Sequence, residues 1–273
     1  MDGGDPGEGT PADRTAGPAR EPAQRLRASY LIERPSELQA QAPGRWEIPG
    51  MVASNPHAFG AQFGQFWASA SAQPHVRRQS GDPGGAVGVG FGLGDADRYL
   101  GLHVAAMSFT TRSGFGDRGA VDVQIHRTFE GIVSLAVGWE SAHHWGGDFT
   151  ENDSGSNRYG VASVWVNLGP EDEPFSAMMI SAGMGDGRFQ SERAFLRGTD
   201  KVGFFGSIGV RVWPPGSLIV EWTGQDLQVA TSVTPLKDRR FAVLAGITDV
   251  TGNAGDGVRF FMGGSAAYDF VWR

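Results

Sequence analysis

The side chains best suited to metal chemistry form one short group in the middle of the chain. They are His143, His144, Asp148, Glu151 and Asp153. Imidazole nitrogen and carboxylate oxygen both bind divalent metals, and in a loop two adjacent histidines can turn toward the same cation. The group falls in the longest polar stretch between apolar segments, residues 141–157. A solvated acidic surface loop explains the same residues without a metal. We favour that interpretation and predict no bound metal.

A second group could support acid–base or nucleophilic catalysis. Asp122 and His126 share one face of an alternating segment, and Ser134 lies on the next segment. A hydrolase of the serine type needs such a nucleophile and base within hydrogen-bond reach. The sequence has neither a nucleophile elbow nor a zinc motif, and it has no cysteine for thiol catalysis. We therefore predict that the protein is not an enzyme.

Two glycine-rich stretches resemble phosphate-binding loops. They are GVGFGLG, residues 88–94 preceded by Val87, and GNAGDG, residues 252–257. A phosphate-binding glycine loop leads from a strand into the N-terminus of a helix, and no helical pattern follows either stretch. We predict no nucleotide or other cofactor.

The first glycine stretch instead belongs to an alternating pattern that recurs along the chain. Val87, Val89, Phe91 and Leu93 alternate with glycines, which predicts a strand with one apolar and one thin face. We predict twelve such strands. They are residues 57–72, 85–94, 99–109, 119–129, 131–141, 158–168, 174–185, 201–213, 217–223, 226–234, 240–249 and 258–272.

The connections between the predicted strands alternate between long and short, and residues 223–226 are the exception. Outer-membrane barrels have this order, with short periplasmic turns and long external loops, and bacterial single-chain barrels have an even number of strands. Aromatic residues near strand ends fit the interfacial girdles of such barrels. They are Tyr99, Phe109, Phe129, Trp139, Trp213, Trp222 and Phe241. The predicted fold class is all-β, an antiparallel up-and-down transmembrane β-barrel of about twelve strands.

The domain organisation predicted from composition is simple. Residues 1–45 are rich in Gly, Pro and charged residues and predict a disordered tail, and residues 55–273 form the barrel. Residues 24–41 could instead form a weak helix. Residues 1–27 contain no recognisable secretory signal. The outer membrane is the predicted location, and a soluble ligand-binding barrel remains an alternative.

Inward polar residues give the barrel its predicted interior. By strand parity the polar network of the lumen comprises Asp122, His126, Glu140, Arg211, Glu221, Asp226, Arg259 and Asp269. Buried charges should be paired or hydrated, and we expect Arg211 to pair with Glu221 across the Pro214–Gly216 turn. The excess of acids over arginines predicts cation preference if the barrel conducts.

Charge and composition limit the partners. The net charge of −7 argues against nucleic-acid binding. We expect outer-membrane lipid and lipopolysaccharide as surroundings, with divalent cations bridging loop carboxylates to phosphates as a further option. A narrow pore for small solutes is the preferred function. A non-conducting structural or adhesive barrel, with its loops as the working surface, is the alternative.

Several segments resemble a known family. They are GVGFGLGDADRYLGLHV, RGAVDVQIHR, AVGWESA, SLIVEWTGQDL and DVTGNAGDGVRF. They look like a family of uncharacterised bacterial outer-membrane β-barrel proteins of the kind found in cyanobacteria, and the likeness covers residues 55–270. The resemblance implies fold and location and no catalytic residues. Tyr268, Phe270 and Trp272 resemble the C-terminal aromatic signal read by the barrel-assembly machinery, although Arg273 follows them.

Overall fold

Twelve antiparallel strands close into a barrel in the computed structural model, which confirms the predicted fold class. The structure describes residues 49–74, 84–109, 115–146, 156–197, 201–236, 241–252 and 257–270. These belong to the compact unit formed by residues 42–273. The predicted tail, residues 1–45, lies outside the described residues. Within the described part, no helix is long and apolar enough to cross a membrane.

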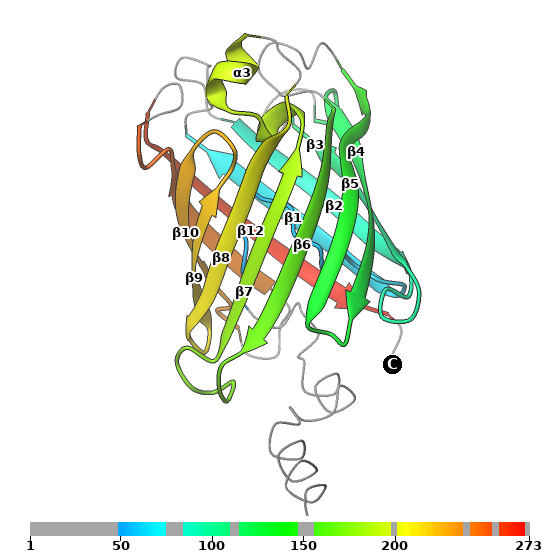
Figure 1. Ribbon diagram of the computed structural model, residues 1–273, viewed down its shortest axis with the longest axis vertical. Helices are drawn as coiled ribbons and strands as arrows, with labels where there is room; N and C mark the ends of the chain where they lie inside the picture. The colour runs from blue at the N-terminus through cyan, green and yellow to red at the C-terminus, as the bar shows by residue number, and fades with distance from the viewer. Residues whose placement is uncertain are drawn as a thin grey trace, which may run out of the picture. The chain divides into compact units, whose positions relative to one another are not determined.

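Each strand pairs with its neighbours in the sequence, and β1 closes the ring by pairing with β12 (Figure 1). The strands are β1 (Gln65–Gln73), β2 (Gly84–Gly94), β3 (Gly101–Ser108), β4 (Gly119–Phe129), β5 (Val133–Trp145), β6 (Asn157–Asn167), β7 (Ala177–Gly185), β8 (Gly203–Trp213), β9 (Gly216–Trp222), β10 (Leu227–Val233), β11 (Phe241–Thr248) and β12 (Arg259–Asp269). The 3-10 helix η1 (Gly187–Phe189) and the helix α3 (Glu192–Leu196) lie between β7 and β8.

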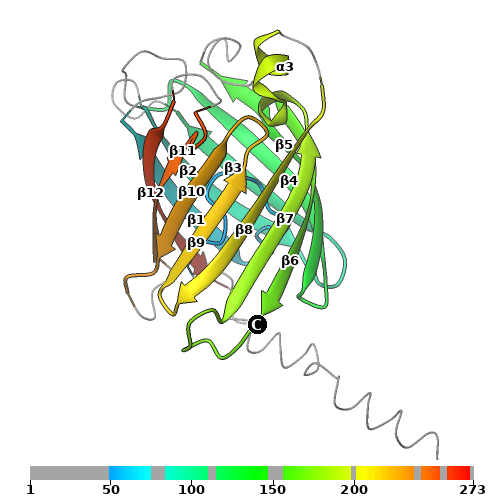
Figure 2. The same ribbon diagram turned by 60° about the vertical axis from the view of Figure 1, so that its left-hand side comes forward.

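The two ends of the barrel differ, as the alternation of loop lengths predicts. One end, here called the short-turn end, carries the connections 95–100, 130–132, 168–176, 214–215 and 234–240. The other, the α3 end, carries the connections 74–83, 109–118, 146–156, 186–202, 223–226 and 249–258. Figure 2 shows α3 at one end of the barrel and the turn between β6 and β7 at the opposite end.

The outer surface is an aliphatic band between two sets of aromatic side chains. Val137, Ile208 and Val220 are exposed near the middle of their strands. Exposed aromatics of the short-turn end include Tyr99, Phe129, Trp213, Phe241 and Tyr268, and those of the α3 end include Trp139, Phe204, Trp222 and Phe260. The strand faces predicted from alternation are confirmed. On β9, for example, Leu218, Val220 and Trp222 are exposed while Ile219 and Glu221 are buried.

The predicted first strand is wrong in its first half. Strand β1 begins at Gln65, and residues 57–64 are not part of it. Residues 49–64, here called the inner segment, run through the barrel interior, where Ala58 and Ala61 have no exposed surface, and reach its rim at the half-exposed Phe63. Figure 2 shows this blue trace within the ring of strands. Small, weakly alternating residues look alike in a strand and in a chain packed inside a polar barrel, so periodicity could not separate the two.

Candidate functional site in the barrel interior

The inner segment runs along the barrel and back. Near the short-turn end, the Gly50 amide donates to Ser232 Oγ at 2.8 Å, and Ser217 Oγ donates to the Gly50 carbonyl. The segment then follows β9 toward the α3 end as far as Ser54. It returns past Ser163 of β6, whose Oγ accepts from the Ala58 amide at 2.8 Å. It rejoins the short-turn end where the Gln62 side chain donates to Asp97 at 3.0 Å.

Glu221 holds the turning point of the inner segment. Its carboxylate accepts the backbone amides of Ala53 at 2.7 Å, Ser54 at 3.0 Å and Asn55 at 3.2 Å. Gln228 Nε2 donates to the same carboxylate. Successive backbone N–H groups that converge in this way form an anion-binding nest. Glu221 is only 1% exposed, so backbone donors rather than bulk water stabilise its charge.

This arrangement corrects the expected Arg211–Glu221 ion pair. Strands β8 and β9 place Arg211 opposite Ser217, and Glu221 opposite Ser207. Four residues of strand, about 13 Å, therefore separate the two rows. Arg211 Nε donates instead to the Pro214 carbonyl at 2.8 Å. Residues 211 and 221 could be opposite only across a turn centred on Gly216, whereas Pro214-Pro215 alone joins the strands and Trp213 is opposite Gly216.

Small inward residues make room for the inner segment. Serines face it from several strands, and Ser134, Ser163 and Ser217 have no exposed surface. At Gly209 a Cβ atom would lie 2.2 Å from the Met51 carbonyl oxygen, and at Gly92 it would lie 2.3 Å from Ala61 and Gln62 backbone atoms. Only glycine permits these approaches. The glycine and serine content of the strands thus reflects a chain inside the barrel.

The α3 end of the interior is covered by η1, which sequence reasoning missed. Arg188 donates from Nε and Nη2 to the two oxygens of Glu140 at 2.6 and 2.7 Å, and from Nη2 to the Ser54 carbonyl at 3.0 Å. Burial opposes the charge of Arg188, but attraction and hydrogen bonding by Glu140 outweigh it, so the pKa of Arg188 lies above its ordinary value. One arginine thereby joins the loop, the wall and the inner segment.

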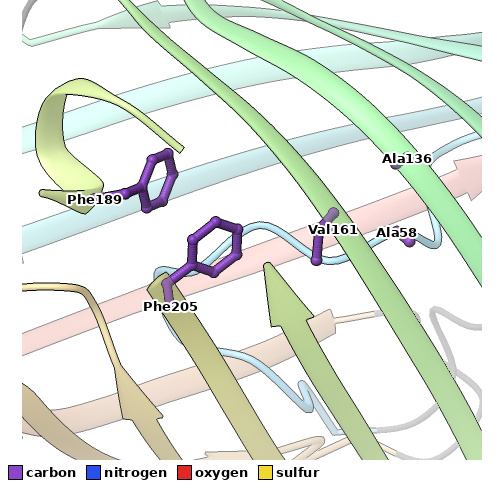
Figure 3. Packing of buried hydrophobic residues seen from close by; sticks show 5 residues of the cluster. All are labelled: Ala58, Ala136, Val161, Phe189 and Phe205. Atoms are coloured by element: carbon purple, nitrogen blue, oxygen red, sulfur yellow. The ribbon is translucent and has the colours of Figure 1, made fainter. Parts of the chain in front are cut away.

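The residue after the partly buried Arg188 is fully buried. Phe189 has no exposed surface and stacks on Phe205 of β8, with ring centroids 4.3 Å apart. Figure 3 shows these rings together with Val161, Ala136 and Ala58. This cluster is an apolar seal between the loop, the wall and the inner segment. An arginine directly before a phenylalanine in the longest connection that the structure partly describes was the available signal in the sequence.

The structure places the remaining predicted lumen residues at several points of the interior. Asp226 and Arg259 do come together, with Arg259 Nη2 3.5 Å from Asp226 Oδ2, and Thr248 also donates to that oxygen at 2.9 Å. Asp122 Oδ1 accepts the Ser141 amide at 2.6 Å, close to a bulge between β4 and β5. Asp269 faces inward at the short-turn end, opposite Gln65.

The candidate catalytic group is not assembled. His126 Nε2 donates to the Ala61 carbonyl at 3.1 Å, and Ser134 Oγ donates to the Ala58 carbonyl at 2.8 Å. In the β4–β5 register, His126 is opposite Ala136 and Ser134 is opposite Thr128. Asp122 lies four residues from His126 along β4, about 13 Å away. These side chains hold the inner segment in place.

The candidate metal ligands are also arranged differently from the prediction. His143 and His144 are the end of β5 and not part of a loop, so their side chains leave the strand on opposite faces. Asp148, Glu151 and Asp153 lie outside the described residues. Among the described residues, no cluster of three or more potential metal ligands occurs.

One part of the interior wall is not covered by the inner segment. Hydrogen bonds join the segment to β3–β6 and to β8–β10, and Met51 and Phe59 pack on β7, so we call the inward face of β3–β10 the covered wall. The inward faces of β11, β12 and β1 are here called the open wall. Ser265 faces inward in mid-strand, opposite Ser69 and near Ala242, and it is exposed. An inward side chain can be exposed only where protein atoms leave space beside it.

The fold and interior define a class: closed antiparallel barrels with an apolar outer band and an interior occupied by their own chain. Comparison of the sequence with models of known protein families finds no match, and comparison with curated proteins finds none.

Proposed function

We propose that the protein is an outer-membrane barrel that admits small hydrophilic solutes through a narrow passage beside the open wall. The outer surface supports the location. An aliphatic band with aromatic girdles at both ends is the pattern that lipid and interface impose on a spanning barrel. We also propose that the chain belongs to the family it resembles, that lipopolysaccharide surrounds it in the outer leaflet, and that the barrel-assembly machinery recognises its C-terminal strand. Tyr268 of that strand and Phe270 directly after it are exposed.

The inner segment limits the size of the passage. It fills the interior against the covered wall, and the Arg188–Phe189 loop seals that side at the α3 end. Space remains beside Ser265, whose exposure in mid-strand is the observation that carries the proposal. Around Ser265 the open wall carries the small side chains of Ser69 and Ala242, and the larger Trp67 and Phe261 lie further along the same face. A passage with such a lining suits small, hydrated solutes.

Thiol labelling tests the passage directly, because the natural chain has no cysteine. In Ser265→Cys, a membrane-impermeant, thiol-specific methanethiosulfonate reagent should react in folded protein in lipid vesicles and should lower the single-channel conductance. Ser207→Cys is the matched control, because Ser207 is also an inward serine but only 4% exposed, under Asn55 and Glu221. It should react only after unfolding. An unreactive thiol at position 265, or equal reaction at both positions, would refute the passage.

The location has its own test. The full-length protein should fractionate with outer membranes and migrate faster on gels when unheated, because closed barrels resist detergent. Recovery in the soluble fraction would exclude the membrane proposal and favour a soluble ligand-binding barrel.

The alternative of a non-conducting barrel has support from the seal at the α3 end, where Phe189 is fully buried among Tyr159 and Phe205. In that case the external loops would be the working surface. Planar-bilayer recordings decide between the two, since a folded, inserted protein that never conducts fits only the alternative.

A further inference from the structure

The inner segment enters and leaves the barrel at the same end. Gly50 lies beside Ser217 and Ser232, next to the Pro214-Pro215 turn. Gln62 lies beside Ala96 and Asp97 in the β2–β3 turn, also at the short-turn end. The segment is therefore a loop with both feet at one opening. It can move out through that opening without any chain end having to cross the barrel.

The barrel wall closes independently of this loop. Each of the twelve strands pairs with its two neighbours around the ring. The described part of the inner segment makes only one strand-like pairing, the isolated bridge between Phe63 and Gly92 at its end. The segment is otherwise held by hydrogen bonds that involve a side chain, chiefly those of Glu221 and Asn55, and by packing of Met51 and Phe59 on β7. Breaking them costs no strand pairing, so the segment can leave while the barrel persists.

Withdrawal would uncover a mainly polar surface, interrupted by apolar side chains such as Met179 and Ile219. The covered wall carries Ser134, Ser163, Ser207 and Ser217, together with the carboxylate of Glu221, and each is at most 4% exposed while the segment is in place. A core meant to stay closed is normally apolar, because unpaired polar groups are costly to bury. Serine and carboxylate side chains face this segment and would equally well face water.

We propose that residues 49–64 are a gate, drawn out through the short-turn end by traction from their N-terminal side, which opens a wide lumen for hydrophilic solutes too large for the resting passage. This rests on the proposed outer-membrane pore. Traction on the Gly50 foot first loads the contacts of Gly50 and Met51 and then the amides of Ala53–Asn55 that Glu221 holds. The return limb past Ala58 then follows.

A disulfide can lock the Gly50 foot. A Cβ atom at Gly50 would lie 3.5 Å from Ser232 Cβ, within the range that disulfides span. In Gly50→Cys/Ser232→Cys, oxidation should therefore fix the segment to β10 and reduction should release it. The probe is urea, which weakens contacts of peptide and apolar groups. It is used at concentrations that leave the fast gel mobility of the folded barrel unchanged.

The readout is conductance in planar bilayers before and after urea. The wild type and the reduced double variant should show a several-fold, reversible rise in conductance in urea, and the oxidised double variant should show none. The two single-cysteine variants are the controls and should respond to urea as the wild type does. An equal rise in the oxidised variant, or no rise in any form, would overturn the gate.

A second measurement covers the case in which the double variant does not fold. In Ser207→Cys, the buried thiol should become reactive to the same impermeant reagent in urea, and should be protected again on its removal. A thiol that stays unreactive up to barrel unfolding would refute withdrawal. These experiments also separate failure of the gate from failure of the proposed pore. If the pore proposal is wrong, the thiol of Ser265→Cys stays unreactive and no resting conductance is seen, both without urea.

Discussion

Serines on opposite sides of the barrel interior have opposite surroundings. Ser163 and Ser217 on the covered wall have no exposed surface and bond the inner segment, whereas Ser265 on the open wall is exposed. The residue type and the strand face are the same in both places. What differs is the presence of a second layer of chain. A polar inward face in a barrel can therefore be a lining for water or a docking surface for the protein's own backbone.

Of the substitutions that test this comparison, removal of the Glu221 carboxylate should have the largest effect. Glu221→Ala removes the acceptor of three backbone amides, and each buried unpaired donor costs about 1–3 kcal/mol. We expect the free energy of opening the inner segment to fall by about 3 kcal/mol or more, measured by hydrogen exchange at Ala53–Asn55. Ser265→Ala should leave that exchange unchanged. Equal effects would mean that the two walls do not differ.

The outer face provides the next largest effect. Leu135 is half exposed on the outside, near the start of β5 and opposite Ala162 at the centre of β6. Leu135→Arg should cost about 2–4 kcal/mol of folding free energy in a bilayer, because it places a charge in the hydrocarbon layer. Ser265→Arg, inward on the open wall, is the comparison. Titration with urea in lipid vesicles gives both values. Similar tolerance of the two changes would argue against a lipid-facing Leu135.

A substitution on the covered wall tests the same difference between the two walls. Gln124 is buried, donates to the His57 carbonyl at 3.2 Å and accepts from the Tyr159 hydroxyl at 2.7 Å. A longer, charged side chain cannot fit there, so Gln124→Arg should cost about 1–3 kcal/mol in urea titrations. Ser265→Arg should be nearly neutral. Strand parity by itself would predict that both substitutions are tolerated. If Gln124→Arg leaves the stability unchanged, the inner segment does not restrict this position.

A pair of glycines tests the close approach of the inner segment. Gly209→Ala would bring a methyl group against the Met51 carbonyl oxygen, whereas Gly160 has open space where a methyl would lie. We expect Gly209→Ala to destabilise the inner segment by about 1 kcal/mol and Gly160→Ala to have no such effect. Hydrogen exchange of amides in residues 50–55 is the measurement. Faster exchange in the Gly160 variant would point to a general effect on the wall.

The smallest effect concerns ion selectivity. Glu140 is neutralised by Arg188, and Arg259 lies beside Asp226, so the cation preference expected from inward acids is weakened. We expect a slight cation preference that disappears as salt rises, because the Debye length falls from ~10 Å at 0.1 M to ~3 Å at 1 M. Reversal potentials at several salt concentrations measure it. Anion preference would contradict this charge argument.

Much of the wall was predictable from the sequence. Strand β4 has the predicted bounds, and the inward and outward faces of β2, β5 and β9 follow from strict alternation. Such patterns arise because one face meets an apolar medium and the other does not. They contain no information about what fills the inside.

The interior was therefore where prediction failed. Residues 57–64 lack strong alternation and were joined to the following strand, and Arg188 sits in a loop with no repeating pattern. The Arg211–Glu221 pairing depended on turn register, which a Pro-Pro connection does not reveal. Interactions between segments distant in sequence, such as Glu221 with Ala53–Asn55, have no local signature at all.

The route of the inner segment also bears on how the chain folds. Because both of its feet are at the short-turn end, the segment enters the barrel as a loop, and within the described residues it docks without threading an end through the ring. The ring of strands can thus form first, with β1 meeting β12, and the segment can dock afterwards as a separate step. Closure of the strand ring and docking of the inner segment can consequently occur in either order.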